Sequence, residues 1–140
     1  MPRYWVIAPY DSQKTEIFEN AWSYDLKHNT IAVGWRELPD ASKLDKAELE
    51  AKFKEIFPQV TNKGNITRDV NTIWNFLHEI SIGDYILARK GTKKLIGHGI
   101  VKGTPYYDVS AGKDRVGNLT ENYYPYLIPV EWEQKKYKLF

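Results

Sequence analysis

The spacing of the apolar residues changes at Gly83-Asp84, and this change constrains the fold more than any other feature. From residue 42 up to this point the spacing is helical, and after it the apolar residues form short runs typical of strands. The pattern predicts helices over residues 42–57 and 67–80, and a hairpin of two strands over residues 85–89 and 95–101. Ser42 is the expected cap of the first helix, with Asp45 three residues on as in a capping box.

The rest of the chain predicts shorter elements and one long connection. Strands are expected over residues 3–8, 30–35 and 126–132, a short helix over residues 12–22 and a polar turn over residues 27–29. Pro129 favours an edge position or a bulge for the last strand, because proline donates no hydrogen bond to a sheet. Residues 103–124 are expected to form a loop. This order of elements favours an α+β fold with a curved, barrel-like sheet and helices packed outside it.

The bulk composition fits one small domain. The 140 residues include 42% hydrophobic residues, enough for a core, and we expect residues 1–140 to form a single domain. The longest apolar runs span about five residues, whereas a membrane-spanning helix needs about 20. No signal-peptide pattern begins the chain, so a cytoplasmic location is expected. The absence of cysteine excludes disulfide bonds and thiolate chemistry.

The sequence patterns of catalysis are missing. His28, His78 and His98 have no second histidine or carboxylate at metal-binding spacing. There is no Gly-x-Ser-x-Gly motif, and Gly97-His98-Gly99 begins like a dinucleotide fingerprint but lies in a predicted strand. We therefore assign no catalytic, cofactor-binding or metal-binding residue, and we expect this chain not to be an enzyme.

Aromatic residues are more abundant than a core of this size needs. Five Trp, ten Tyr and five Phe make up 14% of the chain. Two explanations stay open: a core rich in aromatic rings, or rings that stack on a planar ligand such as a nucleobase. Trp22 and Trp35 end a predicted helix and a predicted strand, where pocket residues are common, so they are the stacking candidates. Trp5, Trp74 and Trp132 are expected in the core.

A base-binding pocket also needs polar groups and positive charge. Ser23, Tyr10 and Asp40 are candidates for contacts with a base edge, although Asp40 can equally cap the helix that follows it. The net charge of the chain is only +2, but its cations gather locally. The candidates for contacts with a nucleic-acid backbone are Arg89, Lys90, Lys93, Lys94, Lys113 and Arg115. Exposed lysines in a turn are also compatible with simple solvation.

Several segments, taken in order, carry a resemblance to one family. They are Tyr4-Trp5-Val6-Ile7, Ile31-Ala32-Val33-Gly34-Trp35 with Glu37-Leu38 and Asp40, Ile73-Trp74-Asn75-Phe76, Ile82-Gly83-Asp84-Tyr85-Ile86-Leu87-Ala88, the hairpin over residues 91–101 and the closing segment over residues 123–132. The chain resembles the EVE branch of the PUA-like superfamily, whose relatives include the YTH domains. It looks most like the EVE domains that precede the motor in McrB-type modification-dependent restriction proteins.

The resemblance implies a barrel-like sheet with flanking helices and a cleft that takes a flipped base. Trp22-Ser23 stands where the YTH relatives carry one wall of an aromatic cage, and Trp35 or Tyr106 is implied as the second wall. The implied function is that of a non-catalytic DNA reader for a modified, methylated base. Any motor NTPase or nuclease would lie in another domain or a partner. Two alternatives stay open: a PUA-like protein that binds structured or modified RNA, and an enzyme acting on a nucleotide or another small molecule.

Overall fold

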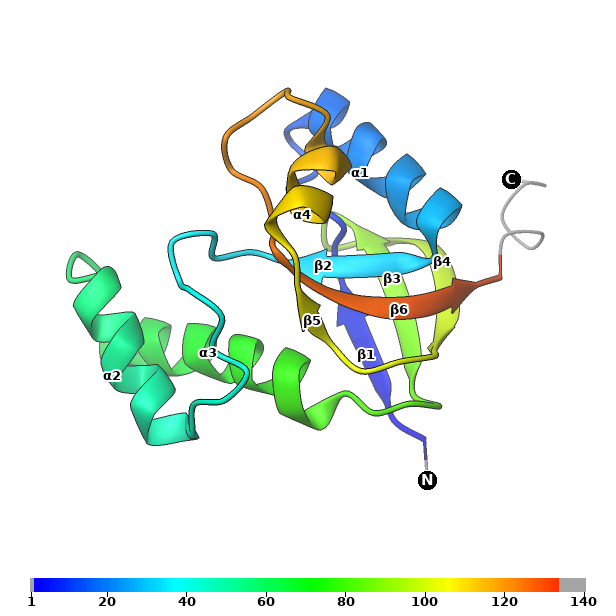
Figure 1. Ribbon diagram of the computed structural model, residues 1–140. Helices are drawn as coiled ribbons and strands as arrows, with labels where there is room; N and C mark the ends of the chain where they lie inside the picture. Colours follow the sequence, from blue (N-terminus) through cyan, green and yellow to red (C-terminus); the bar gives the residue numbers. More distant parts are fainter. Residues whose placement is uncertain (1, 134–140) are drawn as a thin grey trace.

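The strand β6 (Tyr126–Trp132) joins the two halves of a curled, mixed sheet in an α+β fold (Figure 1). The computed structural model describes residues 2–133. The other elements, in chain order, are β1 (Tyr4–Ile7), α1 (Thr15–His28), β2 (Thr30–Val33), α2 (Lys46–Ile56), α3 (Lys63–Trp74), the π-helical turn η1 (Asn75–Glu79), β3 (Tyr85–Lys90), β4 (Lys94–Val101), β5 (Tyr106–Tyr107) and α4 (Val109–Val116).

The sheet has the strand order β1-β3-β4-β6-β2. β1 and β3 are parallel, the other neighbours are antiparallel, and β5 forms a short pairing with the first residues of β6. Because the sheet curls into a half-barrel, its two end strands β1 and β2 lie on either side of an open seam. Within residues 2–133, each end strand pairs with a neighbouring strand on one side only, so the other backbone edge faces the seam.

Pro129 lies inside this sheet, so of the two expectations for its strand, an edge position or a bulge, the edge position is wrong. It stands opposite Thr30 of β2, and on its other side its carbonyl accepts a hydrogen bond from Lys102 N at 3.0 Å. The missing N–H of the proline faces this second side, where β6 changes its partner from β5 to β4. A proline is tolerated here because the ladder is already interrupted.

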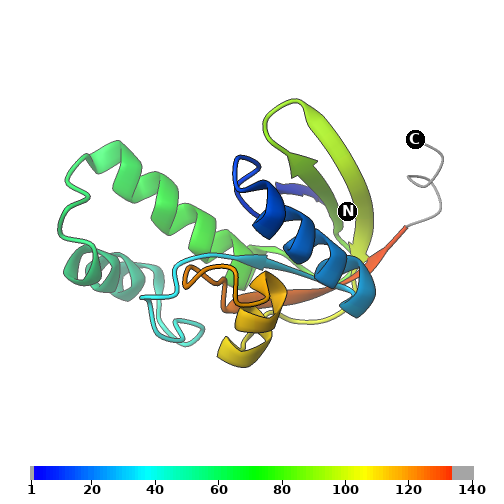
Figure 2. The same ribbon diagram turned by 90° about the horizontal axis from the view of Figure 1, so that it is seen from above.

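The helices form two pairs on different sides of the sheet. α1 packs against α4, and α2 packs antiparallel to α3 at some distance from them (Figures 1 and 2). The α2–α3 pair contributes Leu49, Phe53 and Ile73 to the main core, which also contains the sheet residues Ile86 and Ile128. The α1–α4 pair encloses a smaller cluster made of Phe18, Ala21, Val116 and Tyr10. None of the helices in this described part of the chain is long and apolar enough to cross a membrane.

The cap of α2 differs from the expectation. Asp45 is the N-cap: its carboxylate accepts a hydrogen bond from Glu48 N at 2.8 Å, and the Glu48 carboxylate accepts one from Asp45 N at 3.0 Å. The capping box is therefore Asp45 with Glu48 rather than Ser42 with Asp45. Ser42 lies in the preceding turn, where its N–H donates to the carboxylate of Asp40 at 3.0 Å.

Several other elements also differ from the expectation. α3 begins at Lys63 because the Asn62 side chain accepts a hydrogen bond from Asn65 N, and the helix passes into η1 after Trp74. α1 runs into the expected polar turn and ends at His28, and its C-cap Asn29 adopts the left-handed conformation with φ 55°. The long connection before β6 is only partly a loop, because it contains β5 and α4. Asp108 caps α4 by accepting a hydrogen bond from Ala111 N at 3.0 Å.

Candidate functional site

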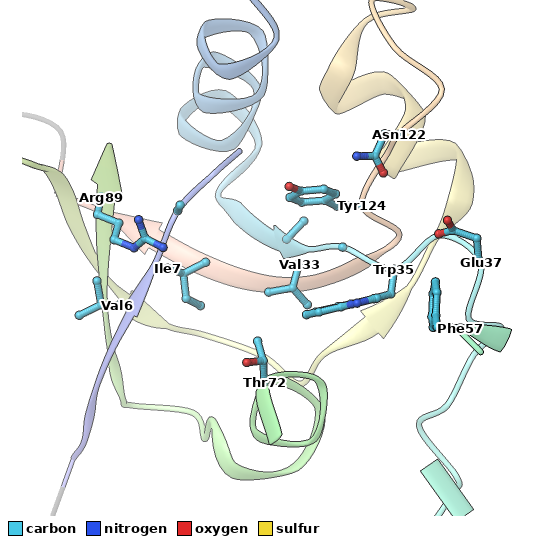
Figure 3. A pocket seen from close by; sticks show the side chains of 13 residues that line it. Val6, Ile7, Val33, Trp35, Glu37, Phe57, Thr72, Arg89, Asn122 and Tyr124 are labelled. Atoms are coloured by element: carbon cyan, nitrogen blue, oxygen red, sulfur yellow. The ribbon is translucent and has the colours of Figure 1, made fainter. Parts of the chain in front are cut away.

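A cleft of about 470 Å³ lies in the seam between the two end strands (Figure 3). We call it the seam cleft. It is lined by Val6, Ile7 and Ala8 from the β1 side, by Ala32, Val33, Gly34 and Trp35 from the β2 side, and by Glu37, Phe57, Thr72, Arg89, Asn122 and Tyr124. Its volume falls within the range of small-molecule sites, and its lining combines apolar surfaces with a few polar groups. The curl of the sheet therefore creates a ligand-sized cavity.

Trp35 presents its indole to the seam cleft from a strained backbone. It follows Gly34 directly after β2 and has φ 70°, which a bulky side chain rarely adopts. The carbonyl of Trp35 accepts a hydrogen bond from Leu38 N at 3.1 Å, which closes a turn at this point. Strained backbone of this kind is often found at binding sites, because the surrounding structure must hold it in place.

Tyr124 supplies a second ring near the indole (Figure 3). Its ring stacks on Tyr10 with centroids 4.8 Å apart, and the Tyr10 hydroxyl donates to the Asn122 carbonyl at 2.8 Å. Gly34 allows this arrangement, since a Cβ at that position would lie 3.3 Å from the Tyr124 ring. Burial raises the pKa of Tyr124 to about 12, so its phenol stays neutral, and able to donate a hydrogen bond, even at alkaline pH.

A cation stands on the other side of the seam cleft. Arg89 of β3 lies near Val6, and its guanidinium donates a hydrogen bond to the Gly91 carbonyl at 2.5 Å (Figure 3). Arg89 also lines an adjoining hollow of about 290 Å³, which shares Ala8 and Tyr124 with the seam cleft. The seam cleft therefore continues toward the β3–β4 turn with a positive charge at the junction.

The seam cleft also continues in the opposite direction, toward η1. A smaller hollow of about 190 Å³ shares Val6, Ile7, Val33 and Thr72 with it, and extends to Asn75 at the start of the π-helical turn. The polar residues that line these two connected spaces include Thr72, Asn75, Glu37 and Asn122, and the Thr72 hydroxyl donates to the Arg68 carbonyl at 2.9 Å. Single π-helical turns within helices frequently accompany functional sites.

Trp22 does not form a wall of the seam cleft. Its ring packs edge-on against Trp132 with centroids 4.9 Å apart, and a Cβ at Gly97 would lie 2.8 Å from it. The indole fills the space beneath β4 and joins the main core to the α1–α4 cluster. The expected slot between Trp22 and Trp35 is therefore absent from the described structure, because Trp22 is occupied in packing.

The other candidates for base contacts are dispersed. Ser23 is exposed on α1, Asp40 holds the turn before α2, and Tyr106 is 40% exposed on β5. None of these three is among the residues that line the seam cleft. Tyr10 is only 4% exposed and supports the cleft through its stacking on Tyr124.

Arg115 is not available to a nucleic-acid backbone, which corrects its assignment. The side chain is fully buried between α1 and α4, where it forms a two-pronged ion pair with Asp25 at 2.7 and 2.5 Å. It also donates to the Pro9 carbonyl at 3.0 Å. Burial raises the pKa of Asp25, and the guanidinium opposes that rise. The pair is a structural clamp, since a charge fully removed from solvent needs a partner to be tolerated.

The remaining cations stay on the surface. Lys90 pairs with Glu19 at 3.3 Å and lies over the Phe18 ring at 5.3 Å. Lys93 and Lys94 are exposed at the β3–β4 turn, and Lys113 is exposed on α4. Of the predicted backbone contacts, Arg89 alone is among the residues that line the seam cleft.

Sequence reasoning missed most of the seam cleft. Tyr124 was one of several tyrosines in a predicted loop, and Thr72 and Asn122 lie in segments with no distinguishing motif. Only Trp35 among the proposed base-binding residues lines the cleft. The hydrophobic character of Val33 predicted a strand, but no local signal could show that this strand ends the sheet.

The fold and the cleft define a class: an α+β protein with a half-barrel sheet whose open seam holds a ligand-sized cavity. The chain belongs to the family described as "Domain of unknown function (DUF8426)", whose model matches residues 5–139. No curated protein and no solved structure matches this chain.

Proposed function

We propose that this chain is a nucleic-acid-binding module that holds one nucleobase in the seam cleft. The observation that carries the proposal is the indole of Trp35, which a left-handed backbone presents to a cavity that Tyr124 also lines. A base needs a flat apolar surface, a few polar atoms at its edge and a cation near its phosphate. Trp35, Thr72 and Arg89 offer these three features in one cavity.

The energies favour a base that has left its stack. Extracting a base from a duplex costs a few kcal/mol, and stacking it on an aromatic side chain returns about 1–3 kcal/mol per base. Trp35 and Tyr124 are two rings available for this. The unpaired backbone edges of β1 and β2 add donors and acceptors that a base edge can use.

A modified base is the proposed ligand. A methyl group that leaves water gains about 0.8 kcal/mol, which gives a fewfold preference. The aliphatic floor formed by Ile7 and Val33, and its continuation toward η1, offer apolar surface for such a group. Together with the sequence resemblance, this supports an EVE-type, PUA-like reader of methylated DNA in the cytoplasm. We propose that it has no enzyme activity, and that it directs a motor NTPase and nuclease in another domain or a partner.

The test is a titration with otherwise identical single-stranded DNA oligonucleotides. One set carries cytosine or 5-methylcytosine, and the other carries adenine or N6-methyladenine, all at one salt concentration. Trp35→Ala should remove the preference for one modified member and weaken its binding by about tenfold, corresponding to about 1.4 kcal/mol of stacking. Trp22→Phe is the matched control, because it keeps an aromatic ring against Trp132. Unchanged preference in Trp35→Ala would refute the pocket.

RNA is the alternative ligand, and the same cleft would serve it. The 2′-hydroxyl is the group by which a protein distinguishes RNA from DNA. Oligonucleotides of matched sequence in DNA and RNA form should be bound unequally, and DNA should be preferred if the proposal is right. Tighter binding of the RNA form would replace the DNA reader with an RNA-binding protein. Conversion of a free modified nucleotide into a product would replace both with an enzyme.

A further inference from the structure

A second hollow shares a wall with the seam cleft. Its volume is about 770 Å³, and the residues that matter to its chemistry are Arg36, Lys113, Glu121 and Tyr123. We call it the outer hollow. It is built from the segment after β2, from α4 and from the connection between α4 and β6.

The two hollows use alternate residues of the same segments. Trp35 and Glu37 line the seam cleft, whereas Arg36 between them lines the outer hollow. The same alternation occurs before β6, where Asn122 and Tyr124 line the seam cleft and their neighbours line the outer hollow. Consecutive Cα atoms are about 3.8 Å apart, so the two hollows lie on either side of a single chain segment.

The outer hollow is suited to an anion. Arg36 and Lys113 are both exposed, and neither takes part in an ion pair within residues 2–133. Lys113 Nζ lies 5.5 Å from the centre of the Tyr123 ring, which keeps the ammonium at the hollow. Glu121 contributes one opposing charge, so the hollow has two cations against one carboxylate.

We propose that the outer hollow binds the sugar–phosphate backbone of the strand whose base occupies the seam cleft. Arg36 and Lys113 contact the phosphates next to that base. The inference rests on the proposed function, and it identifies the ligand as a polynucleotide rather than a free base or nucleoside. A nucleic-acid strand bound in this way passes over the segment at Trp35 and Arg36 that separates the two hollows.

The salt dependence of binding tests this inference. The probe is the DNA oligonucleotide that binds best in the modified-base panel, titrated at several salt concentrations. The slope of log affinity against log salt should fall by about 0.7 for each phosphate of a single strand that the protein no longer neutralises. Arg36→Ala/Lys113→Ala should therefore show a shallower slope and about tenfold weaker binding at low salt. Glu121→Gln should bind more tightly, since it removes the opposing charge.

The control is Lys43→Ala/Lys46→Ala, which removes two exposed cations at the start of α2, outside both hollows. Its slope should match the wild type. An unchanged slope in Arg36→Ala/Lys113→Ala, or equally shallow slopes in both double variants, would overturn the inference. Loss of base preference in Trp35→Ala would still support the seam cleft in that case. A reduced slope with intact preference in Trp35→Ala would instead support the outer hollow and refute the base pocket.

Discussion

Trp35 combines a cost in stability with a role in the cleft. A residue other than glycine in the left-handed region costs about 1–2 kcal/mol, and its indole is only partly buried. The neighbouring Gly34 lacks the side chain that would press on Tyr124 at 3.3 Å. This pair of residues places a large ring at the opening of a cavity, at the expense of local strain. Trp35 also packs against the main core, so its ring contributes to folding as well as to the cleft.

Two substitutions of Trp35 separate strain from binding. Trp35→Ala removes the ring and keeps a strained backbone, whereas Trp35→Gly removes both. Trp35→Gly should therefore be more stable than Trp35→Ala by about 1 kcal/mol in urea unfolding. Both should lose the preference for a modified base. If Trp35→Gly were the less stable of the two, the positive φ would not be a source of strain.

Asp84 connects the β1 edge of the seam to the turn before β3. Its carboxylate accepts hydrogen bonds from Arg3 N at 3.1 Å, from the Trp5 indole at 3.0 Å and from Ser81 N at 3.0 Å. Burial alone would raise the pKa of Asp84, but these hydrogen bonds and the Arg3 charge bring it below its ordinary value of 3.8. The Asp84 carboxylate therefore binds a proton more weakly in the folded state than in the unfolded state.

Stability should consequently depend on pH through Asp84. Because the folded pKa is depressed, the stabilisation is present above about pH 4 and is lost as the pH falls through the folded pKa. Asp84→Asn should be about 1–3 kcal/mol less stable than the wild type at pH 7. The difference between the two proteins should shrink in acid, as measured by urea unfolding at several pH values. A difference that stays constant from about pH 7 to about pH 2 would contradict this role.

At the scale of elements, the buried ion pair between α1 and α4 packs against the stacked rings that support the seam cleft. Arg115 lies 5.9 Å from the Tyr124 ring centre and bonds to Pro9, next to the Tyr10 ring that stacks on Tyr124. Its partner Asp25 comes from α1. The clamp therefore links the position of one cleft wall to the packing of two helices.

Removing half of this clamp should be costly. Arg115→Met leaves the Asp25 carboxyl buried without its partner, and it should destabilise the protein by about 3–5 kcal/mol. Asp25→Leu/Arg115→Met removes both charges and should be considerably more stable than the single variant. Thermal and urea unfolding of the two variants measure the difference. Equal stability of the single and double variants would contradict an ion pair that works as a unit.

The cap of α2 gives a smaller prediction at the same scale. Asp45→Ala should cost about 1 kcal/mol, because it breaks the box with Glu48. Ser42→Ala should cost almost nothing, since the bond to Asp40 comes from the Ser42 backbone. Urea unfolding of the two variants compares them directly. A larger destabilisation in Ser42→Ala would restore Ser42 as the cap.

The local pattern predicted elements better than it predicted their contacts. The two helices, the β3–β4 hairpin and the final strand follow from apolar spacing, and the structure confirms them with shifted ends. α4 was missed because it has only eight residues, half of them polar, and they include Gly112. Trp22 and Trp35 looked equivalent in sequence, since each ended an expected element. Only tertiary contacts distinguish the packed ring from the one at the cleft, and Arg115 shows the same limit among the cations.

At the scale of the whole molecule, the site is a consequence of a sheet that does not close. The chain order puts β1 and β2 early, yet they end at opposite edges of the sheet because β3, β4 and β6 lie between them. The curl then brings these edges to either side of one cavity. No local sequence signal specifies this meeting, since it depends on pairings between residues about 100 positions apart, such as Ala32 with Leu127.

The most direct measurement of the central claim is the indole N–H spectrum of the ¹⁵N-labelled protein during titration with the best-bound modified oligonucleotide. The Trp35 resonance, identified by its absence in Trp35→Ala, should shift progressively with occupancy because the base stacks on that ring. The Trp22 and Trp132 resonances, which report on packing beneath β4, should change much less. Binding that leaves the Trp35 resonance unmoved would contradict the placement of a nucleobase in the seam cleft.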